Sequence, residues 1–260
     1  MEYDPLKNRL NSLIRLSPQV RKLFFFAMDL LLLRQAYVKK AIARYAPKTQ
    51  EFRFYDAGAG FCQYSYHVLK LYPEAKVFAT DLKKDYLQHF ASSCRSLFGN
   101  RFHYQEADLQ TFCPKLKYDL AIAIDIMEHI EDDRAVLANF YNCLRPGGKL
   151  IISTPSDLDE AAKFTSEHVR PGYNKQELEA KLFEAGFAIT ESRFSYGRFG
   201  AMAWKLMMKF PLTLLGKSRF SGLLLPFYYL LILPVGLILN KLDQKALNLT
   251  GTGLLVVAEK

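Results

Sequence analysis

Apolar residues along the chain recur with two periods, one typical of strands and one typical of helices. Short apolar runs predict seven strands, and these are 52–56, 76–80, 101–105, 118–124, 149–154, 187–195 and 251–260. Helical patterns such as 134–144 and 175–185 lie between most of them, and Gly186 stands just past the second, as a helix C-terminus prefers. This alternation predicts a doubly wound α/β fold, with a parallel sheet covered by helices on both faces.

A helical leader precedes the predicted sheet. Ser17-Pro18 predicts a helix start, because serine can cap and proline is favoured at the first helical position. The pattern runs to about Tyr45, and residues 23–33 are apolar on nearly every face. Basic residues stand on both sides of this apolar stretch: Arg21, Lys22, Arg34, Lys39 and Lys40.

An insertion of roughly fifty residues separates the last two strands, far longer than a usual loop. Its uncharged stretch, 220–240, is long enough to span a bilayer. A single crossing would leave the last strand on the wrong side of the membrane. Pro226 and Pro234 are expected to break a straight helix, and Lys205 and Lys209 would be costly in a second crossing.

We therefore expect the insertion to lie on a membrane or to insert partly into it, or to cover an apolar substrate pocket. The leader is expected to pack beside the insertion. Basic residues flank it, as a surface-seeking segment requires: Lys205, Lys209, Lys217 and Arg219. The alternative is that leader and insertion bury each other as a second small core.

These patterns divide the chain of 260 residues into a leader at 1–50, an α/β domain at 51–197 plus 251–260, and a hydrophobic insertion at 198–250. The formal net charge of +9 permits nucleic acid, an anionic membrane or an acidic substrate as partner. The four cysteines and five histidines are scattered, so the sequence predicts no metal site and a reduced, cytoplasmic protein.

A glycine-spaced turn follows the first predicted strand, in the segment Asp56-Ala57-Gly58-Ala59-Gly60. Gly58 and Gly60 lack side chains, so a ligand can approach the main chain there. The following segment, 61–71, can form a helix whose N-terminus points at the same place. A Gly-x-Gly turn is also found in ordinary loops, so the acidic residues that follow decide the interpretation.

Three acidic residues stand at the carboxyl ends of the first three strands, where ligands bind in doubly wound sheets. Asp56 ends the first strand, Asp81 ends the second, and Asp108 follows the third. A carboxylate at the position of Asp81 can accept hydrogen bonds from both ribose hydroxyls of a nucleoside. The alternative is that all three residues are helix caps or turn residues.

Several motifs together resemble the class I S-adenosylmethionine-dependent methyltransferases, most closely the ubiquinone- and menaquinone-biosynthesis type. In order they are Asp56-Ala57-Gly58-Ala59-Gly60, Asp81, Ala107-Asp108-Leu109, Ile124-Asp125-Ile126-Met127-Glu128-His129-Ile130 and Leu144-Arg145-Pro146-Gly147-Gly148-Lys149. The resemblance covers about 50–198 and the final strand, and it implies a seven-stranded sheet whose seventh strand runs antiparallel between the fifth and sixth. A dinucleotide-binding oxidoreductase is the main competing fold, but the glycine pattern of that fold contains a third glycine that this sequence lacks.

The resemblance implies S-adenosylmethionine as cofactor and assigns residues to its parts. The implied cofactor-binding residues are Asp56, Gly58, Gly60 and Gln63 after the first strand, Asp81 and Leu82 after the second, Asp108 near the adenine, and Asp125 at the methionine end. Cys62 departs from the small residue usual after the glycine turn, but a thiol is small enough to be tolerated there.

Two histidines and a tyrosine are the predicted catalytic residues. His129 follows the fourth strand, while His168 and Tyr173 lie in the loop after the fifth. A histidine can act as a base near neutral pH when the acceptor is a phenol or hydroxyl. His168 is thus expected to be a base or a substrate ligand, whereas a structural role is as well supported as catalysis for His129.

These features predict an enzyme on the cytoplasmic face of a membrane that methylates a hydrophobic small molecule, such as a lipid, a quinone precursor or a polyene-like phenol, at oxygen. The alternatives are an RNA or protein methyltransferase and a cofactor-binding membrane partner without catalysis. Nucleic acid is not the expected partner, because the Asn/Asp-Pro-Pro-Tyr signature of base methyltransferases is replaced by Ile124-Asp125-Ile126-Met127. The sequence gives no oligomeric state.

Overall fold

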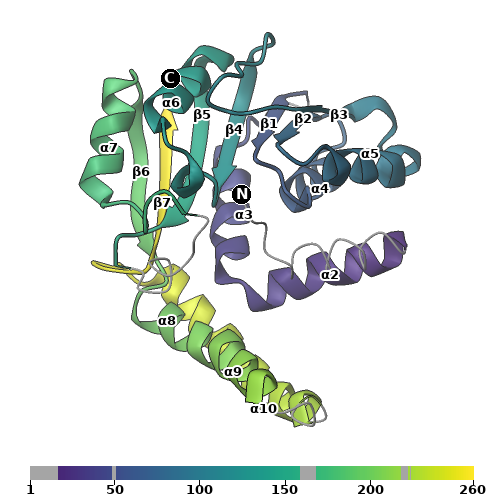
Figure 1. The fold of residues 1–260 in the computed structure, drawn as a ribbon, viewed down its shortest axis with the longest axis vertical. Coiled ribbons are helices and arrows are strands. Elements are labelled where there is room, and N and C mark those ends of the chain that lie inside the picture. The colour runs from purple at the N-terminus through teal and green to yellow at the C-terminus, as the bar shows by residue number, and fades with distance from the viewer. Residues whose placement is uncertain (1–16, 49–50, 159–167, 218–221, 223) are drawn as a thin grey trace.

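The structure is a computed structural model that describes residues 17–48, 51–158, 168–217, 222 and 224–260. Figure 1 shows a sheet with helices packed on it, and a helical hairpin that projects away from this body. Of the basic residues predicted to flank the insertion, Arg219 lies outside the described residues.

The predicted seven-stranded sheet is confirmed. Its order is β3-β2-β1-β4-β5-β7-β6, in which the pairs of β7 with β5 and β6 are antiparallel and all other pairs are parallel. The strands are β1 (Arg53–Ala57), β2 (Lys76–Asp81), β3 (Phe102–Glu106), β4 (Tyr118–Ile124), β5 (Leu144–Pro155), β6 (Ala188–Ser195) and β7 (Gly253–Glu259). The chain order reverses between β1 and β4, and a doubly wound sheet binds its ligand beside that reversal.

Side chains from successive strand positions enter two different cores, because the side-chain period of a strand is two. In β4, Leu120 and Ile122 face one core while Ala121 and Ala123 face the other. The helices that cover the sheet are α4 (Gln63–Leu71), α5 (Lys84–Phe98), α6 (Asp133–Cys143) and α7 (Lys175–Glu184). Two short 3-10 helices, η1 (Gly99–Arg101) and η2 (Met127–His129), follow α5 and β4.

The leader forms two helices, not the single one predicted. Ser17 caps α2 (Pro18–Leu31) as expected, accepting a hydrogen bond of 3.2 Å from the backbone N–H of Val20. Leu32 is extended, and α3 (Leu33–Tyr45) begins after it. The break lets α2 pack along α4 and α5 while α3 packs on β5 and β7 (Figure 1).

The insertion folds as a helical hairpin (Figure 1). Its first arm consists of α8 (Arg198–Trp204), the π-helical segment η4 (Lys205–Lys209) and α9 (Phe210–Lys217), and its second arm is α10 (Leu225–Lys245). The arms are joined by hydrogen bonds from the hydroxyls of Tyr228 and Tyr229 to the carbonyls of Leu206 and Met207, at 2.8 and 2.7 Å.

The prediction that the prolines break the helix is wrong. Pro226 lies in the first turn of α10, where the missing N–H costs nothing. Pro234 lies inside α10, and the helix continues through it. Pairing with the first arm holds the helix on both sides of Pro234, because Tyr228 and Tyr229 are bound before it and Gly236 packs against Met207 after it.

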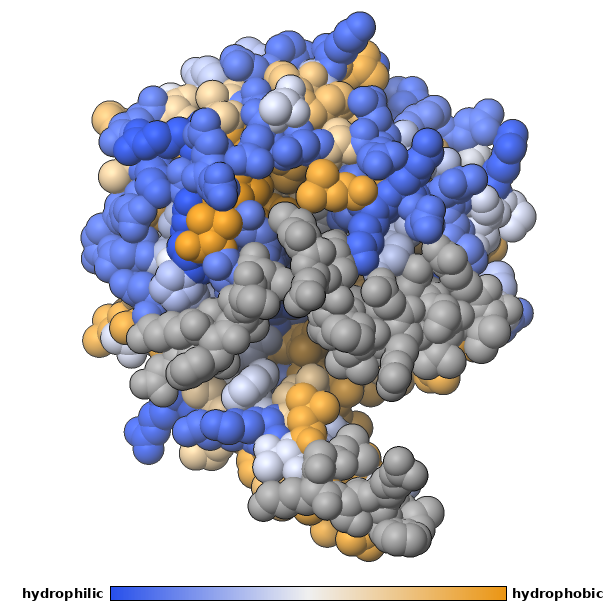
Figure 2. All heavy atoms as spheres, viewed as in Figure 1, coloured by the Kyte–Doolittle hydropathy of each residue, from blue (hydrophilic) through white to orange (hydrophobic). Residues whose placement is uncertain are grey.

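The prediction that the leader packs beside the insertion holds for α3 alone. The Tyr37 hydroxyl donates a hydrogen bond of 2.8 Å to a carboxylate oxygen of Asp243 in α10. In contrast, α2 lies on α4 and α5, where the Arg21 guanidinium donates a hydrogen bond of 3.0 Å to Ser93. In the described part of the leader, the contact with the hairpin lies near the body of the protein, and α10 exposes many apolar side chains. Figure 2 shows hydrophobic residues on the visible face of the hairpin.

Candidate active site

A cavity of about 340 Å³ opens at the carboxyl ends of β1, β2 and β4. Seven of the eight predicted cofactor-binding residues line it, and these are Gly58, Gly60, Gln63, Asp81, Leu82, Asp108 and Asp125. His129 lines the same cavity. The structure therefore places the glycine turn, the second- and third-strand acids and the motif after β4 around one space.

The glycine turn presents its backbone to this cavity. Gly58 and Gly60 have φ angles of +69° and +52°, in the left-handed region that other residues rarely adopt. A Cβ on Gly58 would lie 2.6 Å from the Ile126 side chain, whereas one on Gly60 would meet no heavy atom within 4 Å. Glycine at 58 thus permits close packing on the β4 motif, and Gly60 leaves room for a ligand.

Asp56, the eighth predicted cofactor residue, lies behind the turn and does not line the cavity. Its buried carboxylate accepts hydrogen bonds from the backbone N–H and the hydroxyl of Ser65, at 3.1 and 2.7 Å. Burial raises the pKa of this carboxyl from 3.8 to about 6. In this structure Asp56 fixes the start of α4, and with it the glycine turn.

Asp81 ties the end of β2 to the glycine turn. Its carboxylate accepts hydrogen bonds of 2.8 Å from the backbone N–H groups of Gly60 and Lys83. Asp108 is more exposed, and its carboxylate accepts a hydrogen bond of 2.9 Å from the backbone N–H of Gln110. Both carboxylates face the cavity, so either can accept hydrogen bonds from a bound nucleoside.

The opposite wall of the cavity comes from the leader, which the sequence analysis did not assign to the site. Met28 and Arg34 line the cavity, and Arg34 forms an ion pair with Asp125. Asp125 has a φ of +50°, and its N–H donates a hydrogen bond of 2.8 Å to the Ser153 carbonyl. The signal for Arg34 was present in the sequence as one of the basic residues after the apolar run, but nothing there tied it to β4.

The unpaired polar atoms on these walls fit the polar part of S-adenosylmethionine. Among the described residues, the Gln63 Oε1 and Arg34 Nε atoms are buried and make no hydrogen bond. Both side chains line the cavity, so a ligand with an amino and a carboxylate group could satisfy them. Phe61 and Tyr86 stack with ring centroids 5.2 Å apart and give the cavity an aromatic wall.

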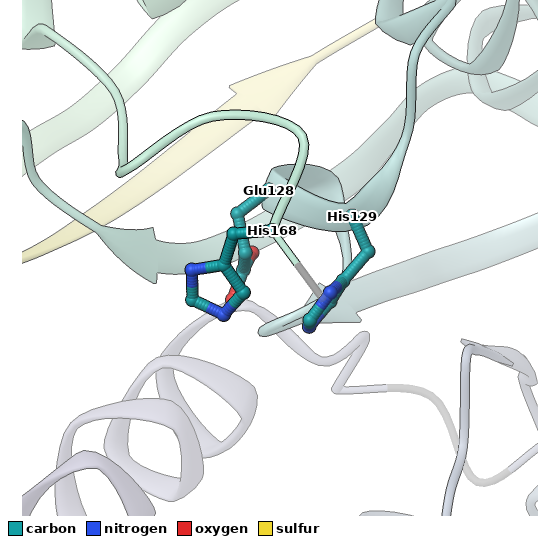
Figure 3. A group of neighbouring side chains, drawn as sticks. All are labelled: Glu128, His129 and His168. Carbon is teal, nitrogen blue, oxygen red and sulfur yellow. The ribbon is translucent and has the colours of Figure 1, made fainter. Parts of the chain in front are cut away.

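The two predicted catalytic histidines lie together although they are distant in the sequence. The His129 and His168 rings are perpendicular, with centroids 4.6 Å apart. Figure 3 shows both side chains pointing the same way as Glu128. His168 does not line the cavity, but its contact with His129 puts it beside the rim.

Tyr173, the third predicted catalytic residue, is completely buried. Its hydroxyl donates a hydrogen bond of 2.7 Å to Asp133, and it also contacts Arg170. Burial raises the pKa of this phenol far above its ordinary value. The structure thus places Tyr173 in the core under the loop and away from the cavity.

The chain resembles known methyltransferases in sequence. Residues 55–150 match the family model of a methyltransferase domain. The trans-aconitate 2-methyltransferase of Azoarcus is 27% identical over 105 residues, which are 40% of each chain. The chain spans less than half the length of this relative and of another curated relative, an uncharacterized protein of Methanocaldococcus jannaschii.

Solved structures share the fold. The phosphoethanolamine N-methyltransferase 2 of Haemonchus contortus, in complex with S-adenosyl-L-methionine, is 19% identical with a TM-score of 0.59, over 84% of this chain and 51% of that one. The cyclase SpnF is 14% identical with a TM-score of 0.58, over 86% and 80%.

Residues 55–150 match a methyltransferase-domain family model, and the strand order together with the solved structures shows the class I methyltransferase fold. The predicted fold is confirmed, and the family match over 55–150 agrees with the predicted enzyme class. The matches do not single out the ubiquinone- and menaquinone-biosynthesis type.

Proposed function

We propose that this protein transfers a methyl group from S-adenosylmethionine to an oxygen of a small molecule with a large apolar part, while its helical hairpin contacts a membrane. The cavity at the glycine turn binds the donor. The acceptor approaches from the side of His129 and His168. The observation that carries this proposal is the exposed apolar surface of the hairpin attached to a methyltransferase domain.

The donor half rests on the cavity walls. When bound, S-adenosylmethionine supplies a methyl group on a positively charged sulfur. The backbone at Gly60 leaves room for the ligand, and Asp81 accepts hydrogen bonds from ribose hydroxyls. Arg34 and Gln63 offer polar atoms to the amino acid part. Holding the methyl carbon and the acceptor in line then supplies much of the rate.

The acceptor half rests on the hairpin. Phe227, Leu230 and Leu231 in α10 are 71%, 74% and 72% exposed. Among the described residues, α10 is the one helix long and apolar enough to cross a bilayer, and only 11% of its most apolar stretch is buried. Exposed apolar surface on this scale is unfavourable in water, and it marks a site that contacts lipid or an apolar ligand.

The geometry of the sheet favours contact with one face of a membrane. The hairpin begins after β6 and ends before β7, and Ser195 pairs with Gly253 where these strands adjoin it. Both ends of the hairpin therefore return to the same body. Lys205 and Lys209 on one arm and Lys241 on the other can bind anionic headgroups while the apolar side chains enter the bilayer.

Two residues at the cavity rim support methylation at oxygen. A hydroxyl or phenol becomes a good nucleophile when a nearby group removes its proton or polarises its O–H bond. His129 and His168 are suited to that role near neutral pH. His168 acts as base or as a ligand of the acceptor. Tyr173 instead holds the loop on which His168 stands, through its hydrogen bond to Asp133.

Flotation with liposomes tests the membrane part of this proposal. The wild-type protein is expected to float with anionic vesicles, and a variant carrying Leu230→Glu and Leu231→Glu is expected to stay at the bottom of the gradient. Leu116→Glu is the matched control, because Leu116 is 56% exposed on the α/β body. A wild-type protein that does not float would contradict the proposed membrane contact.

A further inference from the structure

Three potential metal ligands converge beside the cavity. Glu128 and His129 belong to η2, and His168 belongs to the loop before α7. One ligand atom from each lies within 4.8 Å of the others. In Figure 3 the three side chains come from two segments of the chain and point in one direction.

Backbone contacts hold the two segments together. The Glu128 carbonyl accepts hydrogen bonds from the N–H groups of Val169 and Arg170, at 3.0 and 3.3 Å. The Arg170 guanidinium donates a hydrogen bond of 2.9 Å to the carbonyl of Ile130, which follows His129 in the chain. The loop that carries His168 is thus fixed to η2 on both sides of His129, so the three ligands are preorganised.

The donor set is typical of a divalent transition metal. Two imidazole nitrogens and one carboxylate oxygen suit zinc, manganese or iron(II), and three protein ligands leave positions open for water or substrate. Glu128 is buried, with 1% of its surface exposed, and its Oε2 accepts a hydrogen bond of 3.0 Å from the Thr154 hydroxyl. Such a bond orients a ligating carboxylate.

The position of the cluster relates it to the acceptor. His129 lines the cavity that is assigned to the methyl donor, and Glu128 lies behind it in the body of the protein. A cation held by the three side chains would lie at the cavity rim, where an acceptor oxygen has to be placed. Two positive side chains nearby are already engaged, since Arg34 pairs with Asp125 and the Arg170 guanidinium bonds the Ile130 carbonyl.

We propose that Glu128, His129 and His168 bind one divalent cation of the zinc, manganese or iron(II) class, and that an open coordination position of this cation binds the acceptor hydroxyl. The inference rests on the proposed function for the identity of the acceptor, but not for metal binding itself. Coordination lowers the pKa of the hydroxyl. In this arrangement the two histidines act as metal ligands in place of bases. The proton leaves to solvent, the oxygen lone pair forms the new bond to the methyl carbon, and the carbon–sulfur bond breaks with its electrons on sulfur.

Metal binding can be measured without catalysis. The full chain, stripped with a chelator, is dialysed against Zn²⁺ and analysed for bound metal. One zinc per chain is expected in the wild type. His168→Ala and Glu128→Gln are expected to weaken binding at least about tenfold, since even outer-shell substitutions cost that much. His103→Ala, an exposed histidine on β3, is the control and keeps wild-type affinity.

Two further readouts keep the outcomes apart. Calorimetry with S-adenosylhomocysteine is expected to give wild-type affinity for His168→Ala, which shows that the variant is folded and that the donor site is intact. The proposal is overturned if the wild type binds no stoichiometric zinc, or if His168→Ala binds it equally well. Chelator-resistant methyl transfer without bound metal would overturn the metal site and leave the proposed function standing. Stoichiometric zinc lost in His168→Ala, without methyl transfer to any acceptor, would support the site and contradict the proposed function.

Discussion

Arg34 and Asp125 form an ion pair across the cavity, joining the N-terminal helix α3 to the motif after β4. The two residues are far apart in the sequence, and both line the space assigned to the methyl donor. The leader is therefore part of the donor site as well as a neighbour of the hairpin.

We expect Arg34→Ala to weaken binding of S-adenosylhomocysteine. The pair is partly exposed, so its loss costs about 1 kcal/mol, or roughly fivefold in Kd by calorimetry. Arg44→Ala is the control, because Arg44 lies on the same helix and pairs with Glu191 outside the cavity. Equal affinity of both variants would show that Arg34 plays no part in donor binding.

Asp81→Ala should have a larger effect on the same affinity. Its carboxylate holds the Gly60 N–H and is placed to accept from ribose, and hydrogen bonds to charged groups contribute about 1.5–3 kcal/mol. A decrease in affinity of about 10- to 100-fold is therefore expected. Asp108→Ala removes a more exposed carboxylate from the same cavity and should cost less. If Asp108→Ala proves the more damaging, the assignment of ribose to Asp81 is wrong.

Asp56 makes stability depend on pH. Its pKa is about 6 in the folded protein and 3.8 in the reference state, so the folded protein holds the proton more tightly. The resulting stabilisation is fully present below pH 3.8 and is lost as the pH rises through about 6. The difference corresponds to about 3 kcal/mol.

Urea unfolding of the wild type and of Asp56→Asn, measured from pH 4 to 7, tests this. The side-chain amide that this substitution introduces can still accept hydrogen bonds from Ser65, but it does not titrate. The stability of the wild type relative to Asp56→Asn should fall as the pH rises across this range. A constant difference between the two proteins would refute the raised pKa.

Asp243 attaches the hairpin to the body. Its completely buried carboxylate accepts hydrogen bonds from the Tyr37 hydroxyl at 2.8 Å and from the Gly200 N–H at 2.9 Å. Asp243→Ala should lower the free energy of unfolding by about 2 kcal/mol, since the buried Gly200 N–H loses its acceptor while the Tyr37 hydroxyl keeps the main-chain carbonyl of residue 243 at 3.0 Å. Tyr37→Phe removes the hydroxyl that bonds the Asp243 carboxylate and carbonyl but keeps the Gly200 hydrogen bond, and should cost about 1 kcal/mol. Urea melts that give the reverse order would contradict this role.

Much of the fold could be predicted from the sequence, because each strand and its following turn carry a local signal. The apolar run at 118–124 and the glycines at 58 and 60 predict structure within a few residues of themselves. Pro234 shows the limit of such signals. Its local effect is to break a helix, but in α10 tertiary contacts outweigh it.

The candidate site could be predicted on its donor side only. Gly58, Asp81 and Asp108 follow strand ends in chain order, so the topology alone brings them together. The pairing of Arg34 with Asp125 and the convergence of His168 on Glu128 depend on how the leader and a loop fold back. No local pattern in the sequence encodes those contacts.

Methyl transfer from labelled S-adenosylmethionine tests the proposed function most directly. The protein is incubated with the labelled donor and a total membrane extract, and the label is followed into lipid, protein and RNA fractions. Wild-type protein is expected to label a compound in the organic phase, and Asp81→Ala is expected to label it far less. Label that enters only protein or RNA, or that enters no fraction at all, would contradict a hydrophobic small-molecule acceptor.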